Sequence, residues 1–376
     1  MQSIETYPAH GGQLRQIAEI FGIPQSQLID FSANINPDGP PPAVVLALRA
    51  SLDDPRMFTE YPDIEQAELK ESIASYAGIP TQNVAVANGF VPLLEAALRT
   101  LPIRCCLLPV PAFAEYRKTL ERAKIEIVPY VLRAESRFSY DPEAMVTGQH
   151  DAVLLANPQN PSGICHNADV IRDLIAKASE RNMYVLLDEA FIDYVPEHSL
   201  TTAASEFANL VVFRSVTKFH GMPGLRVAYA VGNPTLSASV STNLAPWPIT
   251  TLAARAVSAA LNDRPYASRA RTENRIRRIA LRRNLDLLEL ASYPSAANFV
   301  LFRLPSLADP NAFWRHMIGE HHIVLRACAN FEALPSGHFR AAVRTQQENG
   351  QLAAAIAESL SHDKYSRLRH VRRRDR

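Results

Sequence analysis

Short apolar runs alternate with amphipathic stretches along most of the chain. Leu14, Ile17, Ala18 and Phe21 fall on one face of a helix, whereas residues 210–213 form a continuous apolar run that is typical of a buried strand. Helices are predicted at 13–22, 42–52, 63–77, 91–100, 114–123, 167–181 and 266–291. Strands are predicted at 104–108, 125–131, 152–156, 183–188, 209–214 and 226–231.

This alternation predicts a mostly parallel sheet whose strands are joined by crossover helices. The proline-flanked Trp247 interrupts it, and the long charged helix at 266–291 then leads to a second domain. There we predict strands at 298–302, 323–326 and 338–343 and helices at 310–319 and 346–360. We expect an α/β fold with a large domain and a smaller α+β C-terminal domain. The expected divisions are an N-terminal arm at 1–36, the large domain at 37–250, the small domain at 251–362 and a basic, disordered tail at 363–376.

Composition narrows the class of protein. Hydrophobic residues make up 47% of the 376 residues, enough for a large core, and the net charge is +1, so no overall field attracts nucleic acid or anionic lipid. No uncharged apolar run is long enough to cross a bilayer. The spacing of the four cysteines matches no familiar metal site. We expect a cytoplasmic protein with no membrane contact and no metal.

The last residues are strongly basic, from Lys364 to Arg376. One interpretation is an arm that binds nucleic acid or an acidic partner. The other is a disordered, solvated terminus, which we prefer because no stacking aromatic residues accompany the charges. We therefore expect no nucleic-acid partner.

Three apolar runs are each followed by a polar side chain. Asn160 comes after residues 153–155, Asp188 directly follows 184–187, and Lys218 comes after the run at 210–213. Parallel strands deliver such side chains to the edge of a sheet where ligands bind. A lysine amine can react with an aldehyde cofactor, a carboxylate can keep a pyridine nitrogen protonated, and an amide can hydrogen-bond a ring phenolate. Together the three predict a pyridoxal-phosphate site.

The segments around these residues resemble the fold-type I aminotransferase superfamily of pyridoxal-phosphate enzymes. The resemblance rests on residues 157–163 (Asn-Pro-Gln-Asn-Pro-Ser-Gly), 188–191 (Asp-Glu-Ala-Phe), 215–219 (Ser-Val-Thr-Lys-Phe) and 224–226 (Gly-Leu-Arg). It implies a seven-stranded, mostly parallel sheet in the large domain. It also implies that Lys218 is the catalytic lysine, that Asp188 pairs with the ring nitrogen, and that Asn160 contacts the ring.

Within that superfamily, residues 9–12, 30–37 and 111–116 are similar to the threonine-phosphate decarboxylases of cobalamin synthesis, which are related to the histidinol-phosphate aminotransferases. Position 191 is Phe, where the aminotransferase relative has a tyrosine, and this favours the decarboxylase. The resemblance implies decarboxylation of L-threonine O-3-phosphate, a phosphorylated amino acid, to (R)-1-amino-2-propanol O-phosphate. The alternative is a histidinol-phosphate type of transamination.

The resemblance also assigns the remaining cofactor contacts. Phe113 is expected to stack on the pyridine ring, and Ser215 and Arg226 to bind the cofactor phosphate. Gly89 and the amide of Phe90 would add donors at a helix N-terminus, although the Phe90-Val91-Pro92 sequence departs from the acidic or hydroxyl residue of relatives. Tyr61 matches a tyrosine that reaches the cofactor of the neighbouring subunit, which implies a homodimer with shared active sites.

Substrate recognition is expected to depend on further polar groups. By the same resemblance, Arg340 holds the substrate carboxylate, and Arg344 is a second cation in or near the site. His10, Asn34 and Arg326 are candidates for binding the substrate phosphate. A third hypothesis, a regulator that keeps this fold but binds DNA, is disfavoured because the chain begins too close to the fold for a preceding DNA-binding domain.

Overall fold

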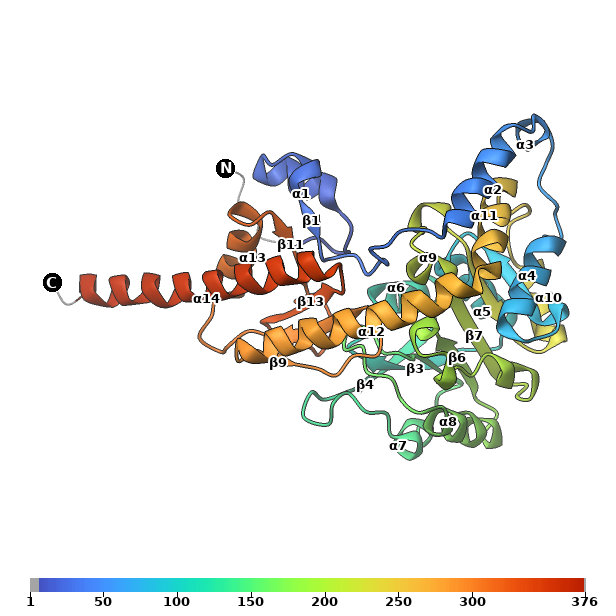
Figure 1. The fold of residues 1–376 in the computed structure, drawn as a ribbon. Helices are drawn as coiled ribbons and strands as arrows, with labels where there is room; N and C mark the ends of the chain where they lie inside the picture. The colour runs from blue at the N-terminus through green and yellow to red at the C-terminus, as the bar shows by residue number, and fades with distance from the viewer. Residues whose placement is uncertain (1–6, 375–376) are drawn as a thin grey trace.

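A seven-stranded sheet forms the centre of the larger part of the molecule (Figure 1). The computed structural model describes residues 7–374, and side chains for residues 7–361. The strand order is β2-β8-β7-β6-β5-β3-β4, and only β8 runs against the others. The strands are β2 (Val84–Ala87), β3 (Cys105–Val110), β4 (Glu126–Val131), β5 (Ala152–Ala156), β6 (Tyr184–Asp188), β7 (Leu210–Ser215) and β8 (Ala228–Val231). The predicted mostly parallel α/β sheet is confirmed.

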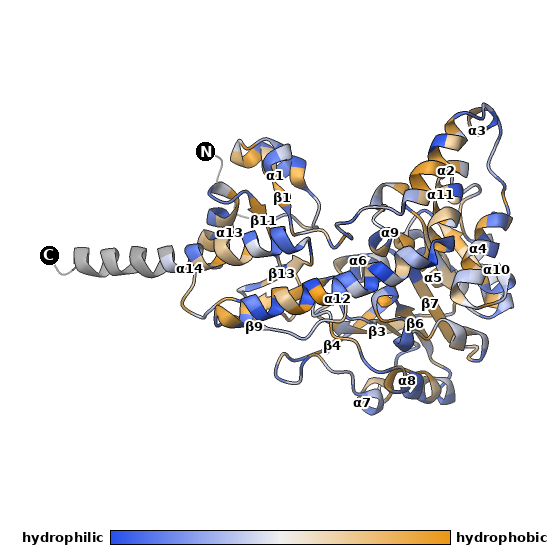
Figure 2. Ribbon diagram, in the orientation of Figure 1, coloured by the Kyte–Doolittle hydropathy of each residue, from blue (hydrophilic) through white to orange (hydrophobic). Residues whose placement is uncertain are grey.

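Helices cover both faces of this sheet, so its central strands are apolar on both sides. Along β5, Val153 and Leu155 pack into one core cluster, and Leu154 packs into the other. Figure 2 shows the apolar colouring gathered on the central strands. One face is covered by α5 (Phe90–Thr100), α6 (Ala114–Arg122) and α10 (Pro234–Thr242). The other is covered by α2 (Pro42–Leu52), α4 (Ala67–Ala77), α8 (Ala168–Glu180) and α11 (Thr251–Asn262), with the short helices α3 (Arg56–Thr59), α7 (Pro142–Val146) and α9 (Val216–Phe219) in the connections.

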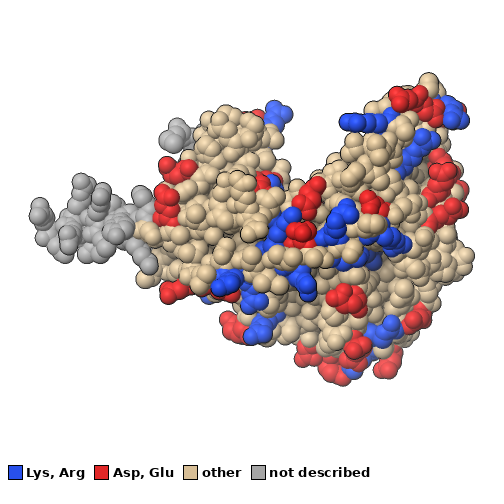
Figure 3. Space-filling model, in the orientation of Figure 1, with Lys and Arg blue, Asp and Glu red and all other residues tan. Residues whose placement is uncertain are grey.

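A smaller unit lies beside the sheet and is joined to it by the long helix α12 (Arg264–Leu287) (Figure 1). Basic side chains gather along α12 on the face drawn in Figure 3, interspersed with acidic ones. An antiparallel sheet of order β12-β13-β10-β9 forms the unit's centre. Its elements are β9 (Ala291–Ser292), β10 (Phe299–Arg303), α13 (Pro310–Gly319), β12 (Arg326–Ala327), β13 (His338–Ala342) and α14 (Gln346–Arg374).

The N-terminal segment packs against this smaller unit. Helix α1 (Leu14–Phe21) contributes Ile17 to the same core cluster as Val300. Strand β1 (Ile29–Asp30) pairs in parallel with β11 (Ile323–Val324). Residues 29–30 thereby pair with a strand about 300 positions later. Residues 31–36 then return towards the large sheet, where Asn36 N–H donates to Lys218 O at 3.0 Å.

Several elements differ from those predicted. β2 and the helices α3, α10 and α11 were not predicted, and the expected strand at 323–326 is split into β11 and β12, which belong to different sheets. Helix α11 packs on α2 and α4 beside the large sheet, so the expected domain boundary at 250 precedes a helix of the larger part. Helix α14 continues to Arg374, through most of the segment expected as a disordered tail, but the side chains after Ser361 lie outside the described residues. Among the described residues, no helix is long and apolar enough to span a membrane.

Candidate active site

Residues at the ends of four strands meet at one edge of the large sheet. Asp188 is the last residue of β6, Ser215 is the last of β7, and Lys218 follows in α9. Gly89 lies just after β2, and Arg226 lies just before β8, whose opposite direction brings its start to the same edge. This edge is where open α/β sheets bind ligands. A cavity of about 380 Å³ lies here, and the expected site residues that line it are His10, Asn34, Gly89, Phe90, Phe113, Asn160, Ser215, Lys218, Arg226, Arg326 and Arg340.

Lys218 is held in surroundings that favour its neutral, nucleophilic amine. Its Nζ lies 3.4 Å from Ser215 Oγ and 5.3 Å from the centre of the Phe191 ring. Burial lowers the pKa of Lys218, and the positive charges of Arg226 and Arg340 lower it further, against the opposing effect of Asp188. A free amine is the form that attacks an aldehyde.

Asp188 does not itself line the cavity and is almost fully buried. One oxygen accepts a hydrogen bond from the Ala190 N–H at 2.8 Å, and the other accepts one from the Tyr116 hydroxyl at 2.5 Å. Burial raises the pKa of Asp188, while the hydrogen bond from Tyr116 and the charge of Lys218 act to lower it. A buried carboxylate with only part of its charge compensated is suited to a cationic ring nitrogen.

Gly89, Ser215 and Arg226 form a cradle for an anion at the start of α5. Gly89 caps the helix with φ of 103°, and a Cβ at this position would lie 2.9 Å from Arg226 Nη2. The Ser215 hydroxyl lies 2.9 Å from that of Thr217. A helix N-terminus, a guanidinium and two hydroxyls are together a suitable donor set for phosphate.

Phe113 and Asn160 line the same cavity and follow two neighbouring strands of the sheet, β3 and β5. Phe113 caps α6, and its ring contacts Tyr116 edge-on with centroids 5.6 Å apart. Asn160 Oδ1 accepts a hydrogen bond of 2.6 Å from Arg340 Nη1. Asn160, which is expected to contact the cofactor ring, is therefore hydrogen-bonded to Arg340, which is expected to bind the substrate carboxylate.

Two arginines from neighbouring strands of the smaller unit line the cavity. Arg326 in β12 is directly opposite Arg340 in β13, so both side chains lie on one face of that sheet. Burial lowers the pKa of Arg340 to about 10. With its amide oxygen facing Arg340, Asn34 lies 3.3 Å from the guanidinium nitrogens.

The N-terminal segment completes this side of the cavity. Arg326 Nη2 donates to Ala9 O at 2.7 Å, which fixes the segment against β12. His10 Nε2 lies 3.1 Å from Glu115 Oε1, and its ring lies 6.3 Å from that of Phe113. The N-terminal segment thereby contacts both Arg326 and α6, the helix that begins after Phe113.

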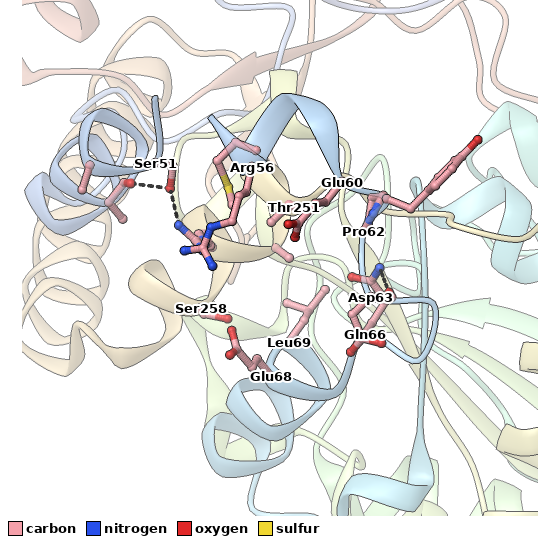
Figure 4. Close-up of a pocket in the computed structure, with 16 residues that line it drawn as sticks. Ser51, Arg56, Glu60, Pro62, Asp63, Gln66, Glu68, Leu69, Thr251 and Ser258 are labelled. Carbon is pink, nitrogen blue, oxygen red and sulfur yellow. Dashed lines mark hydrogen bonds between the residues drawn. The ribbon is translucent and has the colours of Figure 1, made fainter. Parts of the chain in front are cut away.

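Besides Asp188, two expected site residues do not line this cavity. Arg344 donates to Asp30 O at 3.0 Å and pairs with Glu348 at 2.7 Å. Tyr61 is 81% exposed and stacks on Trp247 with centroids 4.8 Å apart. It borders a separate hollow of about 600 Å³ between α2, α3, α4 and α11, where Arg56 and Glu68 project from opposite sides (Figure 4). A contact from Tyr61 to a cofactor would have to be made in a second subunit.

Other residues of the site received no role from the sequence. Tyr116 and Thr217 contact Asp188 and Ser215, as described above, and Asn330 binds the guanidinium of Arg326 at 2.7 Å. Thr217 was detectable as a second hydroxyl beside Ser215. Tyr116 stands one helical turn after Phe113, but its direction depends on how α6 packs. Among the described residues, no group of three or more His, Cys, Asp or Glu side chains could hold a metal ion.

Comparisons with known proteins agree with this geometry. The family described as Aminotransferase class I and II matches residues 26–356. The chain belongs to this family. It is 31% identical over 360 residues to the threonine-phosphate decarboxylase of Salmonella typhimurium, covering 94% of this chain and 97% of that one.

Solved structures extend the comparison. A histidinol-phosphate aminotransferase from Clostridium acetobutylicum superposes with a TM-score of 0.82 at 26% identity, over 88% of this chain and 98% of the other. A histidinol-phosphate aminotransferase from Sinorhizobium meliloti, solved with pyridoxal 5'-phosphate, gives 0.81 at 22% identity over 96% of each chain. The predicted fold-type I architecture and pyridoxal-phosphate dependence are confirmed.

Proposed function

We propose that the protein decarboxylates L-threonine O-3-phosphate to (R)-1-amino-2-propanol O-phosphate for cobalamin synthesis. The main support from the structure is the facing pair Arg326 and Arg340 in the cavity that contains Lys218. A phosphorylated amino acid carries a carboxylate and a phosphate, so it needs two cationic sites besides the one that holds the cofactor phosphate. The 31% identity to a threonine-phosphate decarboxylase along nearly the whole chain supports the same substrate.

The residues present fit pyridoxal phosphate. In this proposal Gly89, the Phe90 amide, Ser215 and Arg226 hold its phosphate, Asp188 pairs with its ring nitrogen, and Phe113 and Asn160 contact its ring. Gly89 is suited to this role because a side chain there would displace Arg226. When bound, pyridoxal phosphate withdraws electrons from the α-carbon of an amino acid.

The protein groups would then decide which bond at the α-carbon breaks. Arg340 holds the substrate carboxylate, and His10, Asn34 and Arg326 hold the substrate phosphate. These contacts would orient the carboxylate as the group to be lost as carbon dioxide, and a proton would take its place on the α-carbon. The Lys218 amine is placed to move that proton, and its lowered pKa allows it to act as both base and acid.

A second candidate is transamination of the histidinol-phosphate type, favoured by the similarity to the Clostridium acetobutylicum enzyme. The same arginines would then hold the substrate so that Lys218 removes the α-proton. Phe191 favours decarboxylation. Its ring lies beside Lys218 but has no hydroxyl to contact the cofactor, whereas the aminotransferase relative has a tyrosine at this position.

The two reactions differ in their products, so an assay separates them. Carbon dioxide release from threonine phosphate, without need for a keto acid, supports the decarboxylase. Keto-acid-dependent turnover of histidinol phosphate, with no carbon dioxide from threonine phosphate, supports the aminotransferase. In either case, borohydride reduction followed by peptide mass analysis should locate the cofactor on Lys218, and a label elsewhere would contradict the assigned site.

We further propose that the protein acts in the cytoplasm as a homodimer with shared active sites. Tyr61 supports this, because it is exposed on its own subunit and does not line the cavity around Lys218. Apolar side chains of α2, of α3 and of the segment before α4 are also more than half exposed, namely Leu46, Leu52, Phe58 and Ile64. A second subunit would cover them.

A further inference from the structure

Tyr116 contacts Asp188, and neither residue lines the cavity. Its ring is 2% exposed, and its hydroxyl donates a hydrogen bond of 2.5 Å to Asp188 Oδ2. The other carboxylate oxygen accepts from the Ala190 N–H at 2.8 Å. Each oxygen of the Asp188 carboxylate therefore already accepts a hydrogen bond from the protein itself.

Helix α6 links this contact to the cavity. Phe113 caps the helix, and Tyr116 lies in its first turn. The Tyr116 ring packs against Phe113 at 5.6 Å and against Phe90 at 5.5 Å, and both of those residues line the cavity. The first turn of α6 thus places the Phe113 ring at the cavity and the Tyr116 hydroxyl against Asp188.

The chemistry of this hydroxyl suits a permanent donor. Burial raises the pKa of Tyr116 well above its usual value, so the phenol stays protonated. For Asp188, burial raises the pKa, and the hydrogen bond from Tyr116 is the largest effect acting to lower it. A donor to the charged form of a buried acid favours ionisation.

We propose that Tyr116 is a positioning residue that keeps Asp188 ionised and aimed at the ring nitrogen of the cofactor. This inference rests on the role proposed above for Asp188. Without the hydroxyl, Asp188 becomes the stronger base, and the shared proton moves from the ring nitrogen towards the carboxylate. The ring then withdraws electrons less strongly.

Tyr116→Phe tests this, because it removes only the hydroxyl and keeps the ring. The measurement is the ¹⁵N signal of the ring nitrogen in protein loaded with ¹⁵N-labelled cofactor, together with the cofactor Kd from fluorescence titration. We expect a shift from the protonated towards the neutral ring and a Kd weaker by about tenfold or more.

Tyr140→Phe is the matched control. Tyr140 is also buried, but its hydroxyl donates to Ala156 O at 2.7 Å, beside Asp188 in the sheet and not to the acid itself. We expect its ring-nitrogen signal to match that of the wild type. Equal signals in the two variants would overturn the proposal. A neutral ring in the wild type would instead contradict the role of Asp188, so the two failures are distinguishable.

A second variant covers the case in which Tyr116→Phe does not fold. Tyr116→3-fluorotyrosine keeps the hydrogen bond and makes the donor more acidic. We expect the ring-nitrogen signal to move further towards the protonated form, and no change or the opposite change would contradict the proposal.

Discussion

Gly89 and Arg226 approach so closely that a methyl group on Gly89 would lie 2.9 Å from Arg226 Nη2. The contact joins the start of α5 to the segment that enters β8. Gly89 also has φ of 103°, a conformation that other residues rarely adopt. The glycine therefore allows a guanidinium to lie against a helix N-terminus, where both can face one phosphate.

Gly89→Ala should weaken cofactor binding, because the new methyl group displaces the guanidinium and strains the helix cap. We expect the Kd for pyridoxal phosphate to rise about tenfold or more and the folded state to lose roughly 1–3 kcal/mol. Fluorescence titration and urea unfolding measure the two effects. Gly224→Ala is the control, since a Cβ there meets nothing within 4 Å. Equal cofactor affinity in both variants would contradict the proposed role of Gly89 and Arg226 in binding the cofactor phosphate.

The sequence was sufficient to predict where Asp188 and Lys218 lie, because each follows an apolar run that forms a buried strand. It did not reveal β2, a run of only four small or β-branched residues, Val84–Ala87, that is held in place by pairing with β8. Pairing between segments about 145 positions apart leaves little local pattern. The same limit explains why residues 323–326 were predicted as one strand, although the chain there passes from one sheet to another.

Most of the expected site residues line one cavity, but their contacts with one another could not be predicted. Arg340 and Asn160 are 180 positions apart, and Tyr116 and Asp188 are 72 apart. Which atoms meet depends on rotamers and on helix packing, and neither follows from residue spacing. The motifs also could not show that Arg344 pairs with Glu348 outside the cavity.

Arg214 forms a buried ionic cluster one residue before Ser215. Its Nη2 lies 2.6 Å from Asp193 Oδ1, and its Nη1 lies 3.6 Å from Glu189 Oε2. Arg214→Met would leave two buried carboxylates without their cation, which should cost about 3–5 kcal/mol of unfolding free energy. Urea unfolding measures this loss. Arg15→Met, which breaks only the exposed pair with Glu19, should change stability little, and a similar small effect for Arg214 would refute the argument.

His166 should make the protein sensitive to acid. Its Nε2 accepts a hydrogen bond from the Tyr140 N–H at 3.0 Å, which requires the neutral ring, and burial lowers its pKa from 6.5 to about 4. Between these values the unfolded chain binds the proton more readily than the folded one. The stabilising contribution is therefore complete above pH 6.5 and is lost as the pH falls towards 4.

His166→Phe keeps an aromatic ring against Tyr140 but removes the titrating group. Unfolding free energies measured between pH 7 and pH 4 should fall less steeply for this variant than for the wild type. His220 and His338, whose pKa values are also lowered by burial, contribute equally to both profiles. Parallel profiles would show that His166 is not responsible.

Arg340→Lys should impair substrate binding, because a single ammonium replaces a planar group that reaches Asn160 and Asn34 together. We expect kcat/KM for the phosphorylated substrate to fall about a hundredfold or more. Steady-state kinetics measure this effect, and the ¹⁵N signal of the bound cofactor should remain unchanged. Arg303→Lys, at an exposed position of β10, is the control. An equal loss in both variants would point to a general effect of replacing arginine rather than to a role of Arg340 in the site.

Tyr61 should act in the active site of the neighbouring subunit. Tyr61→Ala and Lys218→Ala should each lose most activity alone, the first through weaker cofactor binding and the second through loss of the reactive amine. When the two variants are unfolded and refolded together, half of the dimers are mixed, and one of the two sites in each mixed dimer has both residues. Activity should then recover to roughly a quarter of the wild-type value. Absence of recovery, although sedimentation shows that mixed dimers have formed, would mean that Tyr61 does not complete the neighbouring site.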